Sequence, residues 1–203
     1  MELQNQANQP EKKERKYTGA QKIFKESKDY LIILILFMLV YILCFRVVIV
    51  VGDSMFDTLV NGDYLVLISN VFYTDPQYGD IIVASKDSFN DGEPIIKRVI
   101  ATEGQTVDID FDTGIVYVDG QPLQEDYTYT PTNISEGMVF PLTVEEDCVF
   151  AMGDNRNKSR DSRSPDIGQI DRREILGKAI YLFLPGTDEG QMGPDYERMG
   201  AIK

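Results

Sequence analysis

The sequence predicts a mainly β domain preceded by a single N-terminal transmembrane helix. An apolar run close to membrane length extends from Tyr30 to Phe45. Beyond it, short β-branched segments alternate with Gly, Asp and Asn turns, and almost no helical period is present. Closely spaced short strands of this kind favour an all-β barrel or sandwich. The chain of 203 residues suits one such domain with appendages.

Composition excludes several classes of function. The formal net charge is −13, which disfavours a nucleic-acid partner because phosphate binding needs clustered Lys and Arg. The chain has no histidine, and a disulfide between Cys44, in the apolar run, and the distant Cys148 is not expected. Imidazole and thiolate metal sites are therefore nearly excluded. We expect no cofactor and no metal, although carboxylate-bound calcium remains open on composition alone.

Residues 1–28 are polar and charged and are expected to form a cytoplasmic tail. Residues 29–46 are expected to form the transmembrane helix, since a helix of about 18 residues spans about 27 Å, close to a bilayer core of about 30 Å. Residues 1–29 carry seven basic and five acidic side chains, whereas the rest of the chain is strongly acidic. This asymmetry predicts a single-pass protein of the cell membrane, with a cytoplasmic N-terminus and an extracellular C-terminal domain.

Two other interpretations of the apolar run were weighed. A cleavable signal peptide has a shorter apolar region that ends at small residues, but here Arg46 and a run of valines follow without an A-x-A-like site. A buried core helix would show a polar face, and this run shows none. We therefore favour a retained membrane anchor.

Residues 47–185 are expected to form the β domain. Val47–Val51 is a β-branched run that ends at Gly52 and is typical of a buried strand. Turns with Gly and Asp separate the further expected strands, which are 64–68, 81–84, 95–100, 107–111, 115–118, 144–152 and 175–184. Residues 121–141 contain three prolines and are expected to form a long loop. Residues 186–203 have little apolar content and are expected to be a mobile C-terminal tail.

Ser54 follows the first expected strand almost directly. A serine nucleophile needs an adjacent base, and in a chain without histidine that base has to be a lysine or a carboxylate. Ser-Lys pairs are a known variant of this chemistry. A Gly-Asp-Ser sequence by itself is more often only a turn, so Ser54 needs support from elsewhere in the chain.

Lys97 offers that support. It lies on the expected strand 95–100, where alternation puts it on one face with Ile95 and Val99. If this face is turned to the core, burial lowers the pKa of the ammonium and makes Lys97 a usable general base. The alternative is an edge-strand lysine that points to solvent and prevents aggregation.

A dense polar loop follows the expected strand 144–152 and extends from Gly153 to Arg163. It contains four basic side chains and two aspartates. One interpretation is a solvated loop. The other is a loop that folds on itself through Asp–Arg pairs and supports a site.

Four segments together resemble the bacterial type I signal peptidases, membrane-bound Ser-Lys proteases of family S26 that remove signal peptides from exported proteins. In order, the segments are Gly52-Asp53-Ser54-Met55-x-x-Thr58-Leu59, Tyr78-Gly79-Asp80-Ile81-Ile82, Lys97-Arg98-Val99-Ile100 and Gly153-Asp154-Asn155-Arg156-x-x-Ser159-x-Asp161-Ser162-Arg163. The resemblance extends from the anchor to about Pro185. The single anchor and the small body are similar to the Gram-positive branch.

The resemblance implies roles for individual residues. Ser54 is implied to be the nucleophile, with its backbone N–H donating to the oxyanion, and Lys97 the general base. Ser159 is implied to hydrogen-bond the Lys97 ammonium and orient it. The other implied supporting residues are an ion pair of Asp161 with Arg163, and Asp154 and Arg98.

Two positions depart from the family pattern. Asp57 stands where the family usually has proline, so the turn after Ser54 is expected to differ. Gly52 stands where some members have a serine that acts as a second oxyanion donor, so that side-chain donor is absent here. Neither departure affects the proposed nucleophile.

The residues and the resemblance together predict a serine endopeptidase that cleaves N-terminal signal peptides from exported preproteins at the outer membrane surface. Its partners would be secretory preproteins and the lipid bilayer. An extended substrate would pair with Val47–Val51 or with the strand of Lys97, and Val50, Met55 and Ile96 are expected to line small side-chain pockets.

Two alternative functions were weighed. One is a self-cleaving regulator with the same Ser-Lys chemistry, which the anchor and the net charge of −13 disfavour. The other is an inactive anchored paralogue that acts as an extracellular binding domain. The presence of both Ser54 and Lys97 disfavours the inactive paralogue.

Overall fold

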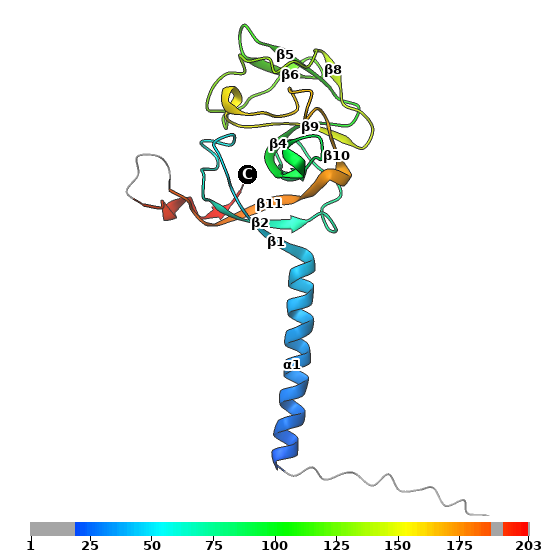
Figure 1. The fold of residues 1–203 in the computed structure, drawn as a ribbon, viewed down its shortest axis with the longest axis vertical. Coiled ribbons are helices and arrows are strands. Elements are labelled where there is room, and N and C mark those ends of the chain that lie inside the picture. The colour runs from blue at the N-terminus through cyan, green and yellow to red at the C-terminus, as the bar shows by residue number, and fades with distance from the viewer. Residues whose placement is uncertain (1–18, 188–192, 203) are drawn as a thin grey trace, which may run out of the picture. The chain divides into compact units, whose positions relative to one another are not determined.

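The computed structural model describes residues 19–187 and 193–202 (Figure 1). The chain divides into two compact units, Met1–Tyr41 and Ile42–Lys203. The first unit contains most of one long helix, and the second contains all the strands of the described residues. Most of the expected tail 1–28 lies outside the described residues.

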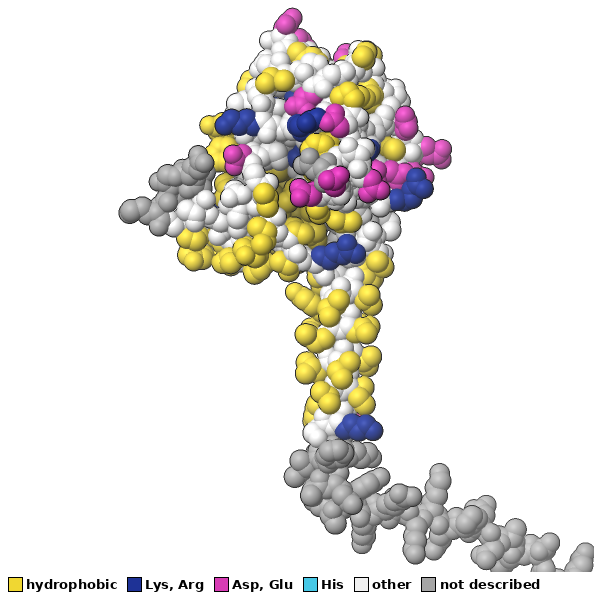
Figure 2. All heavy atoms as spheres, viewed as in Figure 1, with side chains coloured by type: hydrophobic (Ala, Val, Ile, Leu, Met, Phe, Trp, Pro, Cys, Tyr) yellow, Lys and Arg dark blue, Asp and Glu magenta, His cyan; other side chains and the backbone are white. Residues whose placement is uncertain are grey.

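The helix α1 spans Gly19–Cys44 and not 29–46 as the sequence predicted. It begins inside the expected tail, and it ends where the β-branched run takes over at Phe45. Its segment Ser27–Cys44 has a mean hydropathy of 2.1 and is not buried. By length and composition it is the one helix of the described residues that could cross a membrane, and Figure 2 shows apolar side chains along the visible face of this helix.

The second unit is built from two antiparallel sheets, so the predicted mainly β fold class is confirmed. The larger sheet has the strand order β1-β2-β11-β3-β4-β9-β10, with β12 added to β11. Its strands are β1 Phe45–Ile49, β2 Tyr64–Ser69, β3 Ile81–Ser85, β4 Pro94–Thr102, β9 Cys148–Met152, β10 Ile170–Asp171, β11 Ile175–Leu184 and β12 Gly200–Ala201. The smaller sheet has the order β7-β6-β5-β8 and lies at the opposite end of this unit from β1, β2 and β11 (Figure 1).

The strands of the smaller sheet are β5 Thr106–Asp110, β6 Ile115–Val118, β7 Gln121–Pro122 and β8 Leu142–Thr143. Four short 3₁₀ helices of the described residues connect strands or flank them: η1 Asn90–Gly92, η2 Arg156–Lys158, η3 Arg172–Glu174 and η4 Tyr196–Arg198. Residues 121–141, expected to be a long loop, form β7 and are otherwise irregular up to β8.

Two expected strands differ from the structure. The run 47–51 is shifted, because β1 begins at Phe45 and ends at Ile49. The expected strand 144–152 is wrong in its first half: a turn in which Cys148 N donates to Glu145 O at 3.1 Å separates β8 from β9. The acidic residues of this turn break the apolar pattern that suggested one strand.

Three clusters of buried apolar side chains hold the β unit together. One cluster combines Leu65 and Leu67 of β2 with Met55 and Leu59 from the connection after β1. Met55 and Leu59 are each 1% exposed. Burying a side chain of this size stabilises the fold by about 1.5–3 kcal/mol, so the connection that carries Ser54 is anchored in the core.

Residues 193–202 do not form the mobile tail that the sequence predicted. These residues form η4 and β12, and β12 pairs with Tyr181 and Leu182 of β11. Ile202 packs against the cluster that contains Met55. The last segment of the described chain is therefore part of the larger sheet.

Candidate active site

Ser54 lies in a closed loop of residues 50–63 between β1 and β2, called the nucleophile loop below. Two backbone hydrogen bonds close it: Val50 N donates to Asp63 O at 2.8 Å, and Gly62 N donates to Val50 O at 2.9 Å. Gly52 has φ +85°, a conformation that favours glycine, and its N–H donates to Asn61 Oδ1 at 3.0 Å. The loop is thus fixed on both sides of Ser54.

Lys97 reaches this loop from the adjacent part of the larger sheet. Its Nζ donates to Ser54 Oγ at 2.8 Å and to Ile96 O at 2.9 Å. The side chain is 4% exposed, and Lys97 pairs with Ile82 of β3 in the sheet register. The lysine therefore points inward, and the alternative of a solvent-exposed edge lysine does not apply.

Burial lowers the pKa of Lys97 to about 8. The cause is desolvation of the ammonium, which the carboxylates of Asp161, Asp154 and Glu136 oppose. A lysine with this pKa is neutral in a substantial fraction near neutral pH and can accept a proton. Glu136 belongs to the expected loop 121–141 and was not singled out from the sequence.

Arg98, the residue after Lys97, forms a bidentate pair with Asp154. Arg98 Nε and Nη2 donate to the two carboxylate oxygens at 2.9 and 2.8 Å, and both side chains are almost completely buried. Thr58 of the nucleophile loop donates its hydroxyl to Asp154 Oδ2 at 2.6 Å. This network connects the nucleophile loop, β4 and the polar loop after β9.

Most of the polar loop 153–163 is buried, although Lys158 and Arg160 are exposed. Asp161 and Arg163 form an ion pair in which both side chains are 0% exposed. Arg163 also donates to the carbonyls of Arg156 and Ile134 at 2.6 and 3.0 Å, and Asp161 accepts from Gly153 N at 3.0 Å. The pair thus fixes the shape of the loop from inside.

The extension 121–141 packs against this polar loop. Its Glu125 accepts two hydrogen bonds from the buried guanidinium of Arg156, at 2.8 and 2.6 Å. The ring of Tyr127 lies 4.1 Å from the guanidinium carbon of Arg98, a cation–π contact. Tyr129 contacts Phe56 edge to face, with ring centroids 4.8 Å apart. The extension therefore contacts the polar loop, β4 and, through Tyr129, the segment just after Ser54.

Ser159 is buried, but it does not make the hydrogen bond that the resemblance implied. In the described part of the chain its hydroxyl donates to the carbonyl of Arg160 at 3.5 Å, and no hydrogen bond joins it to Lys97. It instead lies against Gly153: a Cβ added there would be 2.2 Å from Ser159 Oγ and 2.4 Å from Ser54 O. Gly153 therefore allows the polar loop and the nucleophile loop to touch.

Asn155 also joins these two loops, and sequence reasoning gave it no role. Its backbone N–H donates to Ser54 O at 3.0 Å, and its side-chain amide donates to Asp53 O at 3.1 Å. Sequence reasoning also gave no role to Thr58, which joins the two loops through its hydrogen bond to Asp154. Both residues stand in the motif segments of the sequence. Their neighbours in the sequence do not indicate that their hydrogen-bond partners are about 100 residues away.

The three expected pocket residues belong to the core. Val50 is 3% and Met55 1% exposed, and Ile96 is half-buried against the same cluster. In this structure they offer almost no free surface beside Ser54, so their role as pocket residues stays a prediction. At Asp57, which stands where the family usually has proline, the peptide bond with Phe56 is cis.

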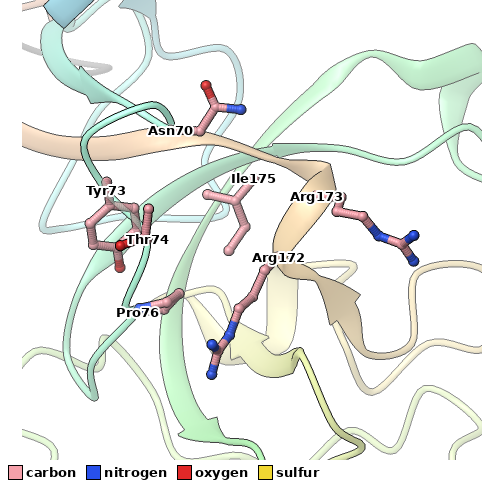
Figure 3. Close-up of a pocket in the computed structure, with 7 residues that line it drawn as sticks. All are labelled: Asn70, Tyr73, Thr74, Pro76, Arg172, Arg173 and Ile175. Atoms are coloured by element: carbon pink, nitrogen blue, oxygen red, sulfur yellow. The ribbon is translucent and has the colours of Figure 1, made fainter.

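A separate pocket of about 270 Å³ lies at η3 and the connection after β2 (Figure 3). Its lining residues are Asn70, Tyr73, Thr74, Pro76, Arg172, Arg173 and Ile175. Figure 3 shows its two arginines extending in different directions, and each is paired with a carboxylate, Arg172 with Glu103 and Arg173 with Asp171. None of the predicted site residues lines this pocket.

The buried ion pair in the polar loop leads to a stability prediction. Arg163→Met is expected to lower the free energy of unfolding by about 3–5 kcal/mol, because it leaves the carboxylate of Asp161 buried without its counter-charge. Arg173→Met is the matched control. Arg173 also pairs with an aspartate two residues before it, Asp171, but its side chain is 89% exposed. Denaturant unfolding of both variants measures the difference. Equal losses for the two variants would contradict a special cost at Arg163.

Comparison with known proteins shows the family of this chain. Residues 23–184 match the family model described as "Signal peptidase, peptidase S26". The "Probable signal peptidase I-1" of Synechocystis sp. is 43% identical over 150 residues, which cover 70% of this chain and 72% of that protein. The chain therefore belongs to the signal peptidase family S26, a family of serine peptidases.

Two further relatives are of the same kind. Signal peptidase I of Bacillus licheniformis is 32% identical over 171 residues, covering 80% of this chain and 89% of that protein. A crystal structure of a signal peptidase I from Enterococcus faecalis is 30% identical, with a TM-score of 0.42, and covers 52% of this chain and 97% of that one.

Proposed function

We propose that this protein is a membrane-anchored endopeptidase that removes signal peptides from exported preproteins, with Ser54 as nucleophile and Lys97 as general base. The observation that carries the proposal is the 2.8 Å hydrogen bond between Lys97 Nζ and Ser54 Oγ, made by a lysine that is 4% exposed. Activation of serine by a desolvated amine meets the need for a base in a chain without histidine.

The reaction follows from these contacts. The neutral amine of Lys97 takes the proton of Ser54 Oγ as Oγ bonds to the scissile carbonyl carbon, and the Ser54 N–H donates to the developing oxyanion. The protonated Lys97 then gives the proton to the leaving amine as the C–N bond breaks, which leaves an acyl-enzyme. Lys97 next takes a proton from a water molecule as the water oxygen bonds to the acyl carbon. The bond between this carbon and Ser54 Oγ then breaks, Lys97 returns the proton to Oγ, and the acid product leaves.

Membrane attachment supports the choice of substrate. The apolar segment Ser27–Cys44 passes without a linker into β1, and Ser54 follows Cys44 by only ten residues. The basic segment before the anchor favours a cytoplasmic N-terminus and an extracellular β domain. We propose that the enzyme acts on the outer membrane surface, where anchoring of enzyme and precursor in one bilayer raises their effective concentration.

We also propose that the substrate binds as an added strand beside Lys97. β9 pairs with β4 from Arg98 onward, so within the described residues the segment Pro94–Lys97 has no β9 partner on that side. An extended peptide there would form main-chain hydrogen bonds next to Ser54. The side chains of Val50 and Met55 are buried and that of Ile96 is half-buried, so they leave room only for small substrate side chains such as alanine.

Cleavage of a precursor with an Ala-x-Ala site by the full chain in detergent tests the proposal. We expect mass spectrometry to find the mature product cut after the second alanine with the wild type and none with Ser54→Ala. Ser88→Ala is the matched control, because Ser88 is an exposed serine distant from the nucleophile loop in the sequence, and it should cut at the wild-type rate. Cleavage by folded Ser54→Ala would exclude the mechanism, and an inactive wild type would favour the anchored binding domain.

A further inference from the structure

Asp63 is a buried charge at the end of the nucleophile loop. Its side chain is 0% exposed. Oδ2 accepts from Val60 N at 2.8 Å, and Oδ1 accepts from Gly186 N at 2.7 Å. A buried carboxylate is costly unless a cation compensates it, and the cation here comes from the last segment of the described chain.

That cation is Arg198. Its Nη2 donates to Asp63 Oδ2 at 2.7 Å and its Nη1 to Oδ1 at 3.0 Å, a bidentate pair. The same Nη2 lies 3.3 Å from the carbonyl oxygen of Thr58. Arg198 therefore contacts the nucleophile loop at two points, 135 and 140 residues earlier in the sequence.

The segment 195–202, called the C-terminal strap below, is itself held in place. Asp195 caps η4 by accepting from Glu197 N at 3.0 Å. After η4, β12 pairs with β11, and Ile202 N donates to Ile180 O at 3.1 Å. Figure 1 shows this red segment beside β11. The strap lies beyond residue 184, where the match to the family model ends.

A chain of hydrogen bonds connects the strap to the residues around Ser54. Thr58, whose carbonyl Arg198 contacts, donates its hydroxyl to Asp154 at 2.6 Å. Leu59, the next residue, donates its N–H to Met55 O at 2.8 Å, one residue after Ser54. Thr58 is thus held by the polar loop through its hydroxyl and by the strap through its carbonyl.

We propose that Arg198 is a positioning residue for catalysis: the C-terminal strap fixes the nucleophile loop so that Ser54 Oγ stays within hydrogen-bond distance of Lys97 Nζ. The proposal rests on the proposed role of Ser54. Small displacements of a nucleophile reduce the rate of the chemical step more than they reduce binding.

The test uses the full chain in detergent with the same precursor and separates kcat from KM. Arg198→Ala is expected to lower kcat about tenfold and to change KM less than about twofold, since only the alignment of the reacting groups is disturbed. Arg198→Lys keeps one cation at Asp63 and should recover a large part of kcat. Arg173→Ala removes an exposed, paired arginine and should leave both constants unchanged.

Folding is controlled by circular dichroism and thermal unfolding in the same detergent. If Arg198→Ala is not folded at the assay temperature, the double variant Asp63→Asn/Arg198→Gln replaces it, because no charge is then left buried. Wild-type kcat in a folded variant overturns the proposal. Loss of the fold in both variants also overturns it, since Arg198 would then serve stability alone.

Ser54→Ala is assayed in parallel. If Ser54→Ala still cuts the precursor, the proposed function fails. If Ser54→Ala is inactive and Arg198→Ala has the wild-type kcat, only the role of the strap is refuted.

Discussion

Lys97→Arg is expected to lower kcat/KM by at least about 10³-fold without loss of the fold, at every pH up to about 10. Arginine keeps the positive charge and much of the length of the side chain. It stays protonated because its pKa exceeds about 12, so it cannot accept the Ser54 proton. The prediction separates a base at this position from a cation that only balances the carboxylates of Asp154 and Asp161.

The pH profile of the wild type belongs to the same prediction. Only the neutral amine acts as base, and burial lowers the Lys97 pKa to about 8. The wild-type kcat/KM should therefore rise about tenfold per pH unit below about 8 and level off above it. Lys97→Arg should show no such rise, and its activity should not return at high pH.

Lys86→Arg serves as the control for this experiment. Lys86 is a partly buried lysine that donates to Gln169 O at 2.6 Å and pairs with Glu174 at 3.5 Å. Both contacts suit a guanidinium equally well, so the variant should keep the wild-type rate and pH profile. Retained cleavage by Lys97→Arg would contradict the role of Lys97 as base, as would a wild-type profile that is flat around pH 8.

Gly153→Ala is expected to reduce kcat by about 10²-fold, the second large effect. The added methyl group would be 2.2 Å from Ser159 Oγ and 2.4 Å from the backbone oxygen of Ser54. The Ser159 hydroxyl can rotate away, but Ser159 Cβ, 2.5 Å from the added methyl group, cannot. The Ser54 carbonyl belongs to the nucleophile loop and moves only with it. The methyl group therefore displaces Ser54 relative to Lys97.

Steady-state kinetics of the folded variant measure this effect, with Gly193→Ala as control. An added Cβ at Gly193 meets no atom within 4 Å, and this residue has no positive φ. The same chemical change should therefore leave kcat unaffected there. Ser159→Gly combined with Gly153→Ala removes the contact with the Ser159 side chain and should not restore the rate, because the contact with the Ser54 oxygen remains. Recovery in that double variant would mean that Ser159 and not the loop is the group displaced.

The parts of the fold with a local pattern could be predicted from the sequence. The strand of Lys97 is an example: its apolar run predicted a strand at 95–100, and the structure has β4 there. Whether the face with Lys97 is buried stayed open in the sequence, because Arg98 and Ile100 on the other face are buried as well. The last strand was predicted at 175–184 because its apolar run is long and ends at a proline. In both cases the side chains that determine the structure are neighbours in the sequence.

The parts that depend on distant partners could not be predicted in this way. Residues 195–202 have the composition of a tail, and only the pairing of Arg198 with Asp63 and of β12 with β11 orders them. Asn155 is a second example, since its role comes from the carbonyl groups of Asp53 and Ser54. The resemblance correctly suggested that Asp161 and Arg163 pair, but it also implied a bond from Ser159 to Lys97 that this structure does not contain.

The buried guanidiniums of Arg98, Arg156 and Arg163 have a consequence for how the protein opens. Arg98 and Arg156 pair with carboxylates that are distant in the sequence, and Arg163 donates to the carbonyl of Ile134 in the extension. Opening one of these segments alone would therefore leave a buried guanidinium without a partner. The polar loop, the extension and β4 should therefore behave as one cooperative unit in hydrogen exchange. Amide protons such as those of Gly153 and Asn155 should exchange only when the whole unit unfolds, which protects a protease from being digested at its own active site.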